Sequence, residues 1–149
     1  MAGKKRVFLD ASVFIAVAGS ESGGSSIILE VCKGIKFSAV TSRRILLEAQ
    51  KNIRKKLPSE ALLHFYKEIA NLSPEIIKPP AEKRLSQYND IIAFKDRHVL
   101  VSALEGKATF LITLDRKHFQ TEAIRKANLL ITIMTPKEFL EFVKKYTEL

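Results

Sequence analysis

Cysteine is nearly absent from this chain, with Cys32 alone among 149 residues. A single thiol cannot form an internal disulfide, which excludes a disulfide-stapled extracellular fold and favours a reducing, cytoplasmic setting. Uninterrupted apolar runs of about 18 residues, the length of a membrane-spanning helix, are also absent. The basic N-terminus followed by VFLDASVFIAVAG imitates a signal peptide, but Asp10 interrupts its apolar stretch. We therefore expect no membrane segment.

Common ligand-binding motifs are missing as well. Neither GxGxxG nor GxxxxGK[ST] occurs, so the small-residue stretch GSESGGSS at 19–26 is interpreted as a flexible connector or a mobile rim over a site. His64, His98 and His118 fit neither HExxH nor another zinc spacing. These absences exclude the usual phosphate-binding loops and zinc sites.

The bulk composition describes a folded, strongly basic protein. The length fits a single domain over 1–149, and 46% hydrophobic with 28% charged residues exclude intrinsic disorder. Lys and Arg outnumber Asp and Glu by 25 to 16, which gives a formal net charge of +9. This charge favours a polyanionic partner, with nucleic acid first. An anionic membrane is the weaker alternative, because the most basic segment carries no aromatic anchor.

Short apolar segments alternate with helical segments along the chain. Apolar strands without alternation are typical of a sheet covered on both faces. Strands are expected at 6–9, 36–40, 108–114 and 129–134, with a weaker one at 75–78, and helices at 12–19, 25–33, 43–57, 59–71, 96–105 and 136–146. This order predicts an α/β sandwich with a mainly parallel sheet.

Three aspartates occupy positions that a parallel sheet would bring together. Asp10 ends the first strand, Asp115 follows the apolar segment FLITL, and Asp96 starts the preceding helix. The carboxyl ends of parallel strands form the ligand-binding edge, and the helix runs antiparallel to the strand after it. We therefore expect Asp96 and Asp115 to be neighbours. Each aspartate could instead be a helix cap or a turn residue.

Glu48 is the fourth acidic candidate. It lies about two turns into the predicted helix 43–57, at the margin of the helix's apolar arc, and its side chain leans back towards the strand edge. A surface ion pair with Arg44 or Lys51 is the simpler alternative, with a contribution of about 0.2 to 0.5 kcal/mol.

Converging carboxylates repel one another unless a cation lies between them. Mg²⁺ or Mn²⁺ prefers oxygen ligands from a few carboxylates, completed by water and substrate phosphate, so the four acids favour a metal site. The polar face of helix 43–57 borders Glu48 and carries Arg43, Arg44 and Lys51. Ordinary solvation would explain such a face, but beside a metal site these cations favour contact with a phosphate backbone.

Three segments make the chain similar to PIN domains, the nuclease domain of VapC-type toxins and related ribonucleases. They are VFLDAS at 7–12, TSRRILLEAQ at 41–50 and KDRHVLVSALEGKATFLITLDRKHF at 95–119. The resemblance implies that the family's catalytic, metal-binding quartet is Asp10, Glu48, Asp96 and Asp115. It also implies a three-layer α/β/α sandwich with the first strand central, and a homodimer.

Two hydroxyl residues and one further acid are supporting candidates. Ser12 and Thr113 match hydroxyl positions of PIN domains, where either could orient water or substrate, but Ser12 could equally be an N-cap. Asp90 could replace Asp96 or support it from nearby.

The expected activity is that of a Mg²⁺- or Mn²⁺-dependent endoribonuclease acting on single-stranded or structured RNA. The resemblance to VapC toxins also implies a cognate antitoxin that blocks the acidic cleft. A non-catalytic nucleic-acid-binding module is one alternative, but it leaves the converging acids unexplained. A haloacid-dehalogenase-type phosphohydrolase is another, but its motif requires a second aspartate where Ser12 stands.

Overall fold

A parallel sheet forms the centre of the computed structural model, which describes residues 3–147. Within these residues the sheet has five strands in the order β3-β2-β1-β4-β5, and every neighbouring pair is parallel. The first strand is therefore central, as expected. The strands are β1 (Lys5–Leu9), β2 (Phe37–Ser42), β3 (Glu75–Ile77), β4 (Phe110–Ile112) and β5 (Thr132–Met134).

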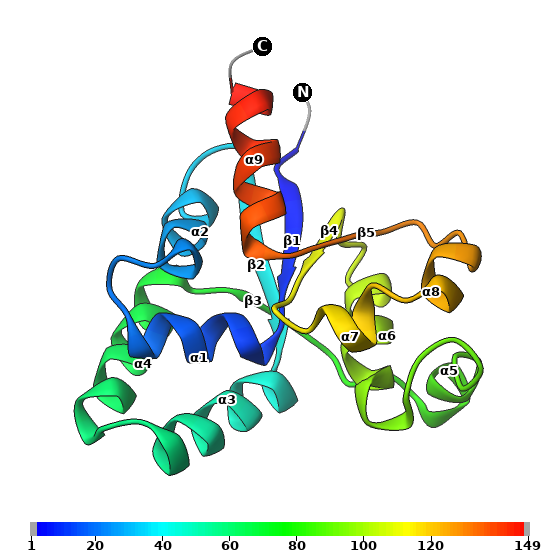
Figure 1. Cartoon of the computed structure of the whole chain (residues 1–149), viewed down its shortest axis with the longest axis horizontal. Helices are drawn as coiled ribbons and strands as arrows, with labels where there is room; N and C mark the ends of the chain where they lie inside the picture. Colours follow the sequence, from blue (N-terminus) through cyan, green and yellow to red (C-terminus); the bar gives the residue numbers. More distant parts are fainter. Residues whose placement is uncertain (1–2, 148–149) are drawn as a thin grey trace.

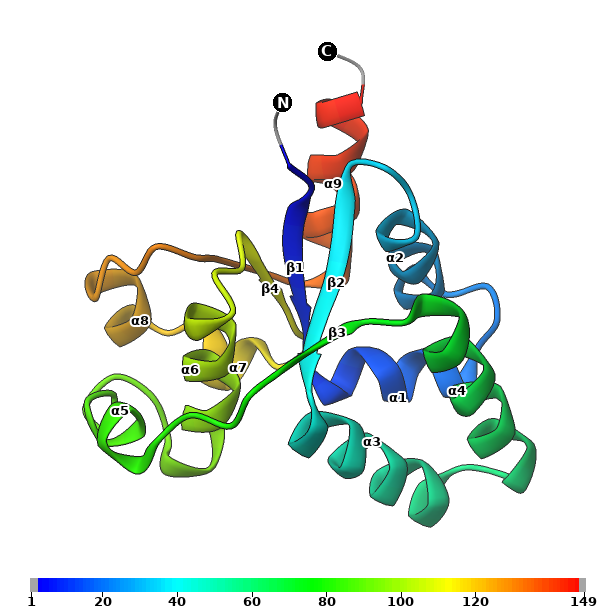
Figure 2. The same ribbon diagram turned by 180° about the vertical axis from the view of Figure 1, so that it is seen from behind.

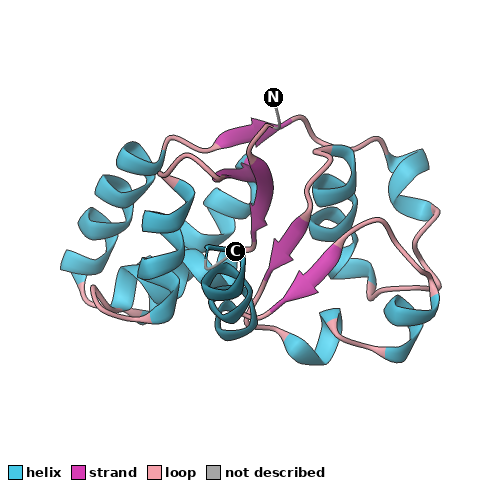
Figure 3. Cartoon of the chain, turned by 90° about the horizontal axis from the view of Figure 1, so that it is seen from above, coloured by secondary structure: helices cyan, strands magenta, loops and turns pink. Residues whose placement is uncertain are grey.

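Helices cover both faces of the sheet, which confirms the α/β prediction (Figure 3). Helices α1 to α4 lie to one side and α5 to α8 to the other, and Figure 2 shows this arrangement from behind. The helices are α1 (Ala11–Gly19), α2 (Gly24–Cys32), α3 (Arg43–Lys56), α4 (Ser59–Leu72), α5 (Glu82–Ser86), α6 (Arg97–Glu105), α7 (Arg116–Phe119), α8 (Glu122–Lys126) and α9 (Pro136–Thr147).

No single helix of the described chain is long and apolar enough to cross a membrane, and only α1 with α2, bent by 112°, reaches that length and composition as a pair.

The core lies between the sheet and these helices. Phe8 in β1 and Leu111 in β4 have no solvent exposure. Helix α9 packs on the sheet through Phe139, whose ring lies edge-on to Phe37 at 5.4 Å and to Phe110 at 5.5 Å between centroids. Apolar burial of this kind holds the strands rigidly, so the polar residues that follow them have fixed positions.

Several boundaries differ from the prediction. The expected strand 129–134 pairs only over Thr132–Met134, and Leu130 is 96% exposed. The reason is that β5 pairs with β4, which is itself only Phe110–Ile112 rather than 108–114. Helices α5, α7 and α8 were not expected, because helices of five residues or fewer show no apolar period. The helix expected at 96–105 begins with a 3₁₀ turn, η1 (Phe94–Asp96).

Candidate active site

The strand order creates a binding position at the carboxyl edge of the sheet. The chain moves outward from β1 through β2 to β3, then returns to the other side of β1 with β4. In open α/β sheets, ligands bind outside the carboxyl ends of the strands where the connections diverge in this way. Asp10 directly follows β1 and Asp115 comes shortly after β4. This edge is the lower one in Figure 1, where α1, α3 and α7 begin.

Asp10 is a buried carboxylate that accepts hydrogen bonds on both oxygens. Its Oδ1 accepts from the Ala11 N–H at 2.8 Å, and its Oδ2 accepts from the Thr113 hydroxyl at 2.7 Å and the Ser12 hydroxyl at 3.3 Å. Burial raises the pKa of Asp10, the hydrogen bond from Thr113 opposes this rise, and the charge of Asp96 adds to it. Asp10 is thus the N-cap of α1 and also an electrostatic neighbour of Asp96.

The two predicted hydroxyl residues tie the end of β1 to the turn after β4. The Ser12 Oγ accepts from the Leu114 N–H at 3.0 Å, and the Thr113 Oγ1 accepts from the Asp115 N–H at 3.1 Å. Ser12 lies inside α1 rather than before it, so its alternative role as an N-cap is wrong. Both hydroxyls therefore fix the Asp115 turn relative to Asp10.

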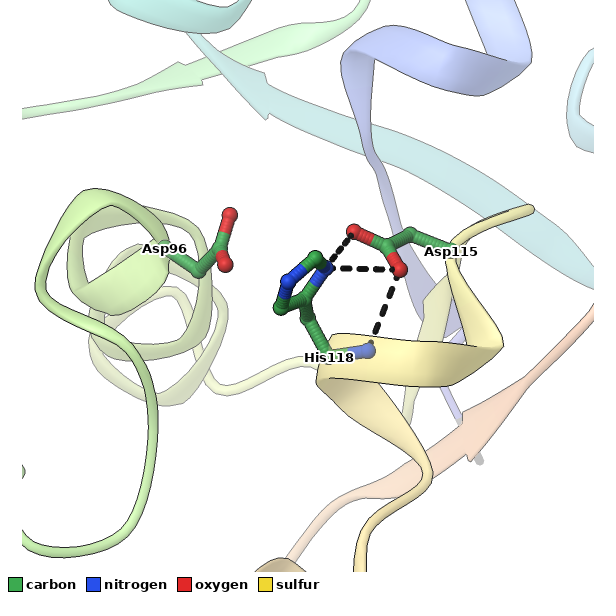
Figure 4. A group of neighbouring side chains, drawn as sticks. All are labelled: Asp96, Asp115 and His118. Atoms are coloured by element: carbon green, nitrogen blue, oxygen red, sulfur yellow. Dashed lines mark hydrogen bonds and ion pairs between the residues drawn. The ribbon is translucent and has the colours of Figure 1, made fainter.

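Asp96 and Asp115 come together as the sequence spacing predicted (Figure 4). Together with His118 they form a group whose potential ligand atoms all lie within 4.8 Å of one another. The Asp115 Oδ1 accepts from the His118 N–H at 3.1 Å, so Asp115 also caps the one-turn helix α7. The His118 Nδ1 lies 2.8 Å from the Asp115 Oδ2.

The carboxylate of Asp96 is not a helix cap. Asp96 precedes α6, but its side chain makes no capping hydrogen bond. Although Asp96 is buried, its carboxylate forms an ion pair with the exposed Lys95, whose Nζ lies 3.1 Å from Oδ2. The capping alternative is therefore wrong for Asp96, and one of its carboxylate oxygens lies within 4.8 Å of potential ligand atoms of Asp115 and His118.

Glu48 reaches the same edge from α3. The residue as a whole is exposed, but its carboxyl group is partly desolvated. Burial and the charge of Asp10 raise the pKa of Glu48, while the charge of Arg44 lowers it. Within the described chain, neither Arg44 nor Lys51 forms an ion pair with Glu48, which argues against the simple surface-pair interpretation.

The remaining predicted residues lie around this group. Arg43, Arg44 and Lys51 are exposed along α3. Asp90 lies in an exposed turn and is not part of the acidic group, so the geometry favours Asp96 over Asp90. His98 is buried in α6, where desolvation and the charge of Arg44 lower its pKa to about 4, so its ring is neutral at pH 7.

The sequence patterns did not predict two residues of the site, His118 and Lys95. The sequence patterns address His118 only as a possible zinc ligand, and they assign no role to Lys95. The available signal was local: His118 stands three residues after Asp115, which one helical turn brings onto the same face. For Lys95 no signal existed beyond its place next to Asp96.

The donor set fits a divalent cation. Carboxylate oxygens suit Mg²⁺ or Mn²⁺, and Asp96 and Asp115 supply them on facing elements. The His118 ring already contacts Asp115, which fits a residue that orients a ligating carboxylate. Asp10 and Glu48 add negative charge close to Asp96, which a bound cation would neutralise.

The chain belongs to the PIN domain family. The family model matches residues 6–117, a span that contains all four predicted acids. This membership confirms the resemblance drawn from the sequence, and the parallel sheet with its central first strand agrees with it.

Individual relatives are distant. The chain is 38% identical over 58 residues to putative ribonuclease VapC50 of Mycobacterium tuberculosis, a match that covers 36% of this chain and only 33% of that protein. The structure of PAE2754 from Pyrobaculum aerophilum has a TM-score of 0.58 at 15% identity, covering 97% of this chain and 99% of that one. Mycobacterium tuberculosis VapC20, described as a Sarcin-Ricin loop cleaving toxin, has a TM-score of 0.52 at 12% identity, covering 84% and 98%. These two structures share the fold.

Proposed function

We propose that this protein is an endoribonuclease that hydrolyses phosphodiester bonds in single-stranded or looped RNA with the help of Mg²⁺ or Mn²⁺. The observation that carries the proposal is the approach of Asp96 and Asp115 at the switch point of a PIN fold, with Asp10 and Glu48 close enough to perturb one another. The net charge of +9 supports a nucleic-acid substrate. Splayed nucleotides of unpaired RNA can enter such an edge more easily than a duplex.

The chain's own residues would divide the work. Asp96, Asp115 and Asp10 would hold the ion, and Glu48 would hold a second ion or orient the attacking water. A bound ion supplies Lewis-acid activation of water and neutralises charge on the phosphodiester. Hydrolysis adds water across a P–O bond and leaves a phosphomonoester and a free hydroxyl.

Outside the acidic group, other side chains would position the substrate and the carboxylates. Thr113 and Ser12 keep the Asp10 carboxylate in place through their hydrogen bonds. Arg43, Arg44 and Lys51 would contact phosphates that flank the cleaved bond.

The relatives support a proposal for the biological setting. VapC50 is named a putative ribonuclease and VapC20 is described as a toxin. By analogy we propose that this chain is the toxin of a toxin–antitoxin pair, that it acts on cytoplasmic RNA as a homodimer, and that an antitoxin protein blocks the acidic edge.

A cleavage assay tests the activity. Purified protein is incubated with end-labelled single-stranded RNA in Mg²⁺, Mn²⁺ or EDTA, beside Asp10→Asn, Asp115→Asn and the control Asp90→Asn, which removes an exposed carboxylate nearby. Cleavage should require metal and fall by more than about 100-fold in the first two variants, since even outer partners of metal ligands are worth about 10- to 100-fold. Cleavage in EDTA, or in both variants, would refute the proposal. RNA binding without cleavage would favour the non-catalytic module.

A further inference from the structure

An exposed aromatic ring borders the acidic group without being part of it. Phe94 opens the 3₁₀ turn that ends at Asp96, and it is 73% exposed. Burial is the usual position for a phenyl ring, because contact with water costs stability. The Phe94 ring, two residues from a proposed metal ligand, is therefore accessible to a substrate bound at the acidic group.

Arg97 holds this ring from one face. The guanidinium carbon of Arg97 lies 3.8 Å from the centroid of the Phe94 ring. Arg97 is only 4% exposed, and its guanidinium donates to the Asn89 Oδ1 at 2.8 Å, the Glu82 Oε1 at 3.3 Å and the Phe94 carbonyl at 3.3 Å. The fixed cation holds the orientation of the ring, and the high exposure of Phe94 leaves the opposite face in solvent.

We propose that the free face of Phe94 stacks on an unpaired nucleobase of the RNA whose phosphodiester lies at the acidic group. The inference rests on the proposed function and adds a substrate contact to it. Single-stranded RNA is bound by aromatic rings that stack on bases beside cations that contact phosphates. Phe94 provides the ring, and Lys95, with its Nζ 3.1 Å from Asp96, provides a cation next to it.

The surroundings favour a nucleotide over an apolar protein segment. The exposed cation next to the ring is Lys95, which matches a phosphate-bearing partner, whereas the buried Arg97 only supports the ring from its other face. A purely structural clamp between Phe94 and the turn would bury the ring, whereas this ring is open to water. Because Arg97 already holds the ring in one orientation, the Phe94 side chain loses less conformational entropy when a base binds.

The absence of tryptophan from the chain supplies a clean reporter. Phe94→Trp carries one indole at the proposed contact and keeps the cation–π partner Arg97. Its fluorescence is followed in EDTA at low salt during titration with a single-stranded RNA oligonucleotide or with an abasic strand of the same length. The matched control is Ile35→Trp, because Ile35 is 85% exposed and lies just before the amino end of β2, at the opposite edge of the sheet.

A second measurement uses variants without a reporter. Binding of labelled RNA is measured by anisotropy for wild type, Phe94→Leu and Phe94→Tyr, and circular dichroism melting checks that each variant folds. Loss of base stacking should weaken Phe94→Leu by roughly 5- to 150-fold, while Phe94→Tyr should bind like wild type. Leucine preserves apolar bulk, so this difference isolates the aromatic face.

The expected result is quenching of the Phe94→Trp indole by the base-bearing strand and not by the abasic strand, with no response from Ile35→Trp. The stacking contact would be overturned if the two strands changed the indole fluorescence equally, or if the two tryptophan variants responded equally. It would also be overturned if Phe94→Leu bound RNA with wild-type affinity, or if the protein bound no RNA. Cleavage is measured separately on wild type in Mg²⁺ and Mn²⁺. Base-dependent quenching without cleavage would refute the nuclease function and leave the stacking contact standing.

Discussion

Replacement of Thr113 by valine removes one hydroxyl from the polar network that holds Asp10. Thr113 is buried, and valine keeps its shape with a methyl in place of the hydroxyl. The variant loses the 2.7 Å hydrogen bond to the Asp10 Oδ2 and the acceptor for the Asp115 N–H at 3.1 Å. The carboxylate of Asp10 remains buried with weaker compensation.

The size of the effect follows from the charged acceptor. A hydrogen bond to a charged group contributes about 1.5 to 3 kcal/mol, so the free energy of unfolding of Thr113→Val should fall by about that amount near pH 8. For a chain of this length, that is a melting temperature lower by roughly 3 to 12 °C. The hydroxyl of Thr113 lowers the pKa of Asp10, so valine raises that pKa further. The stability difference should therefore be largest where Asp10 is ionised and shrink in acid, where Asp10 is protonated.

Urea unfolding in EDTA at pH 8 and at acid pH measures the effect. Thr113→Ser is the matched control because it keeps the hydroxyl, and Asp10→Asn combined with Thr113→Val closes a double-mutant cycle. A coupling energy of at least about 1 kcal/mol between the two positions is expected. A Thr113→Val loss that is the same at both pH values and in the Asp10→Asn background would refute the reasoning.

Three further predictions concern the surroundings of the site. His98 faces Arg44 and Asp96, and its pKa is about 4 in the folded protein against an ordinary value of 6.5. Between these two pH values the unfolded chain binds a proton at His98 and the folded chain does not. The free energy of unfolding in EDTA should therefore rise from about pH 4 to about pH 6.5, by up to about 3 kcal/mol. Urea unfolding of His98→Leu should show a flatter pH dependence, and an unchanged slope would contradict this. Asp96→Asn removes the repulsion between Asp96 and the neighbouring carboxylates without removing a capping hydrogen bond. Its melting temperature without metal should therefore equal or exceed that of wild type. A clear drop in melting temperature would indicate that Asp96 stabilises the fold. Lys51→Gln should weaken RNA binding and reduce the magnitude of the slope of log affinity against log salt concentration by about 0.7. Lys4→Gln is the control and should keep the wild-type slope. A wild-type slope for Lys51→Gln would show that Lys51 does not contact the RNA.

Much of the site was predictable from the sequence because parallel strands place their carboxyl ends at one edge. The spacing from Asp96 to Asp115 fixed their approach, since one helix and one antiparallel return bring the two carboxylates together. Helical periodicity and the lean of helical side chains predicted that Glu48 reaches this edge, where the charge of Asp10 raises its pKa.

Side-chain partners were not predictable in the same way. The contact of His118 with Asp115 depends on a one-turn helix whose four residues carry no periodic signal. The ion pair of Lys95 and the cation–π contact of Phe94 depend on rotamers within an irregular turn. The start of β5 depends on where its neighbour β4 begins rather than on its own apolar residues.

Mn²⁺ binding measured by isothermal titration calorimetry tests most directly whether the acidic edge is a divalent metal centre. Wild type, Asp96→Asn and the exposed-carboxylate control Asp90→Asn are titrated under the same conditions. Wild type and Asp90→Asn should show the same saturable binding, and Asp96→Asn should bind at least about 10-fold more weakly. Equal binding by all three proteins, or no saturable binding by wild type, would contradict a metal centre built on Asp96 and Asp115.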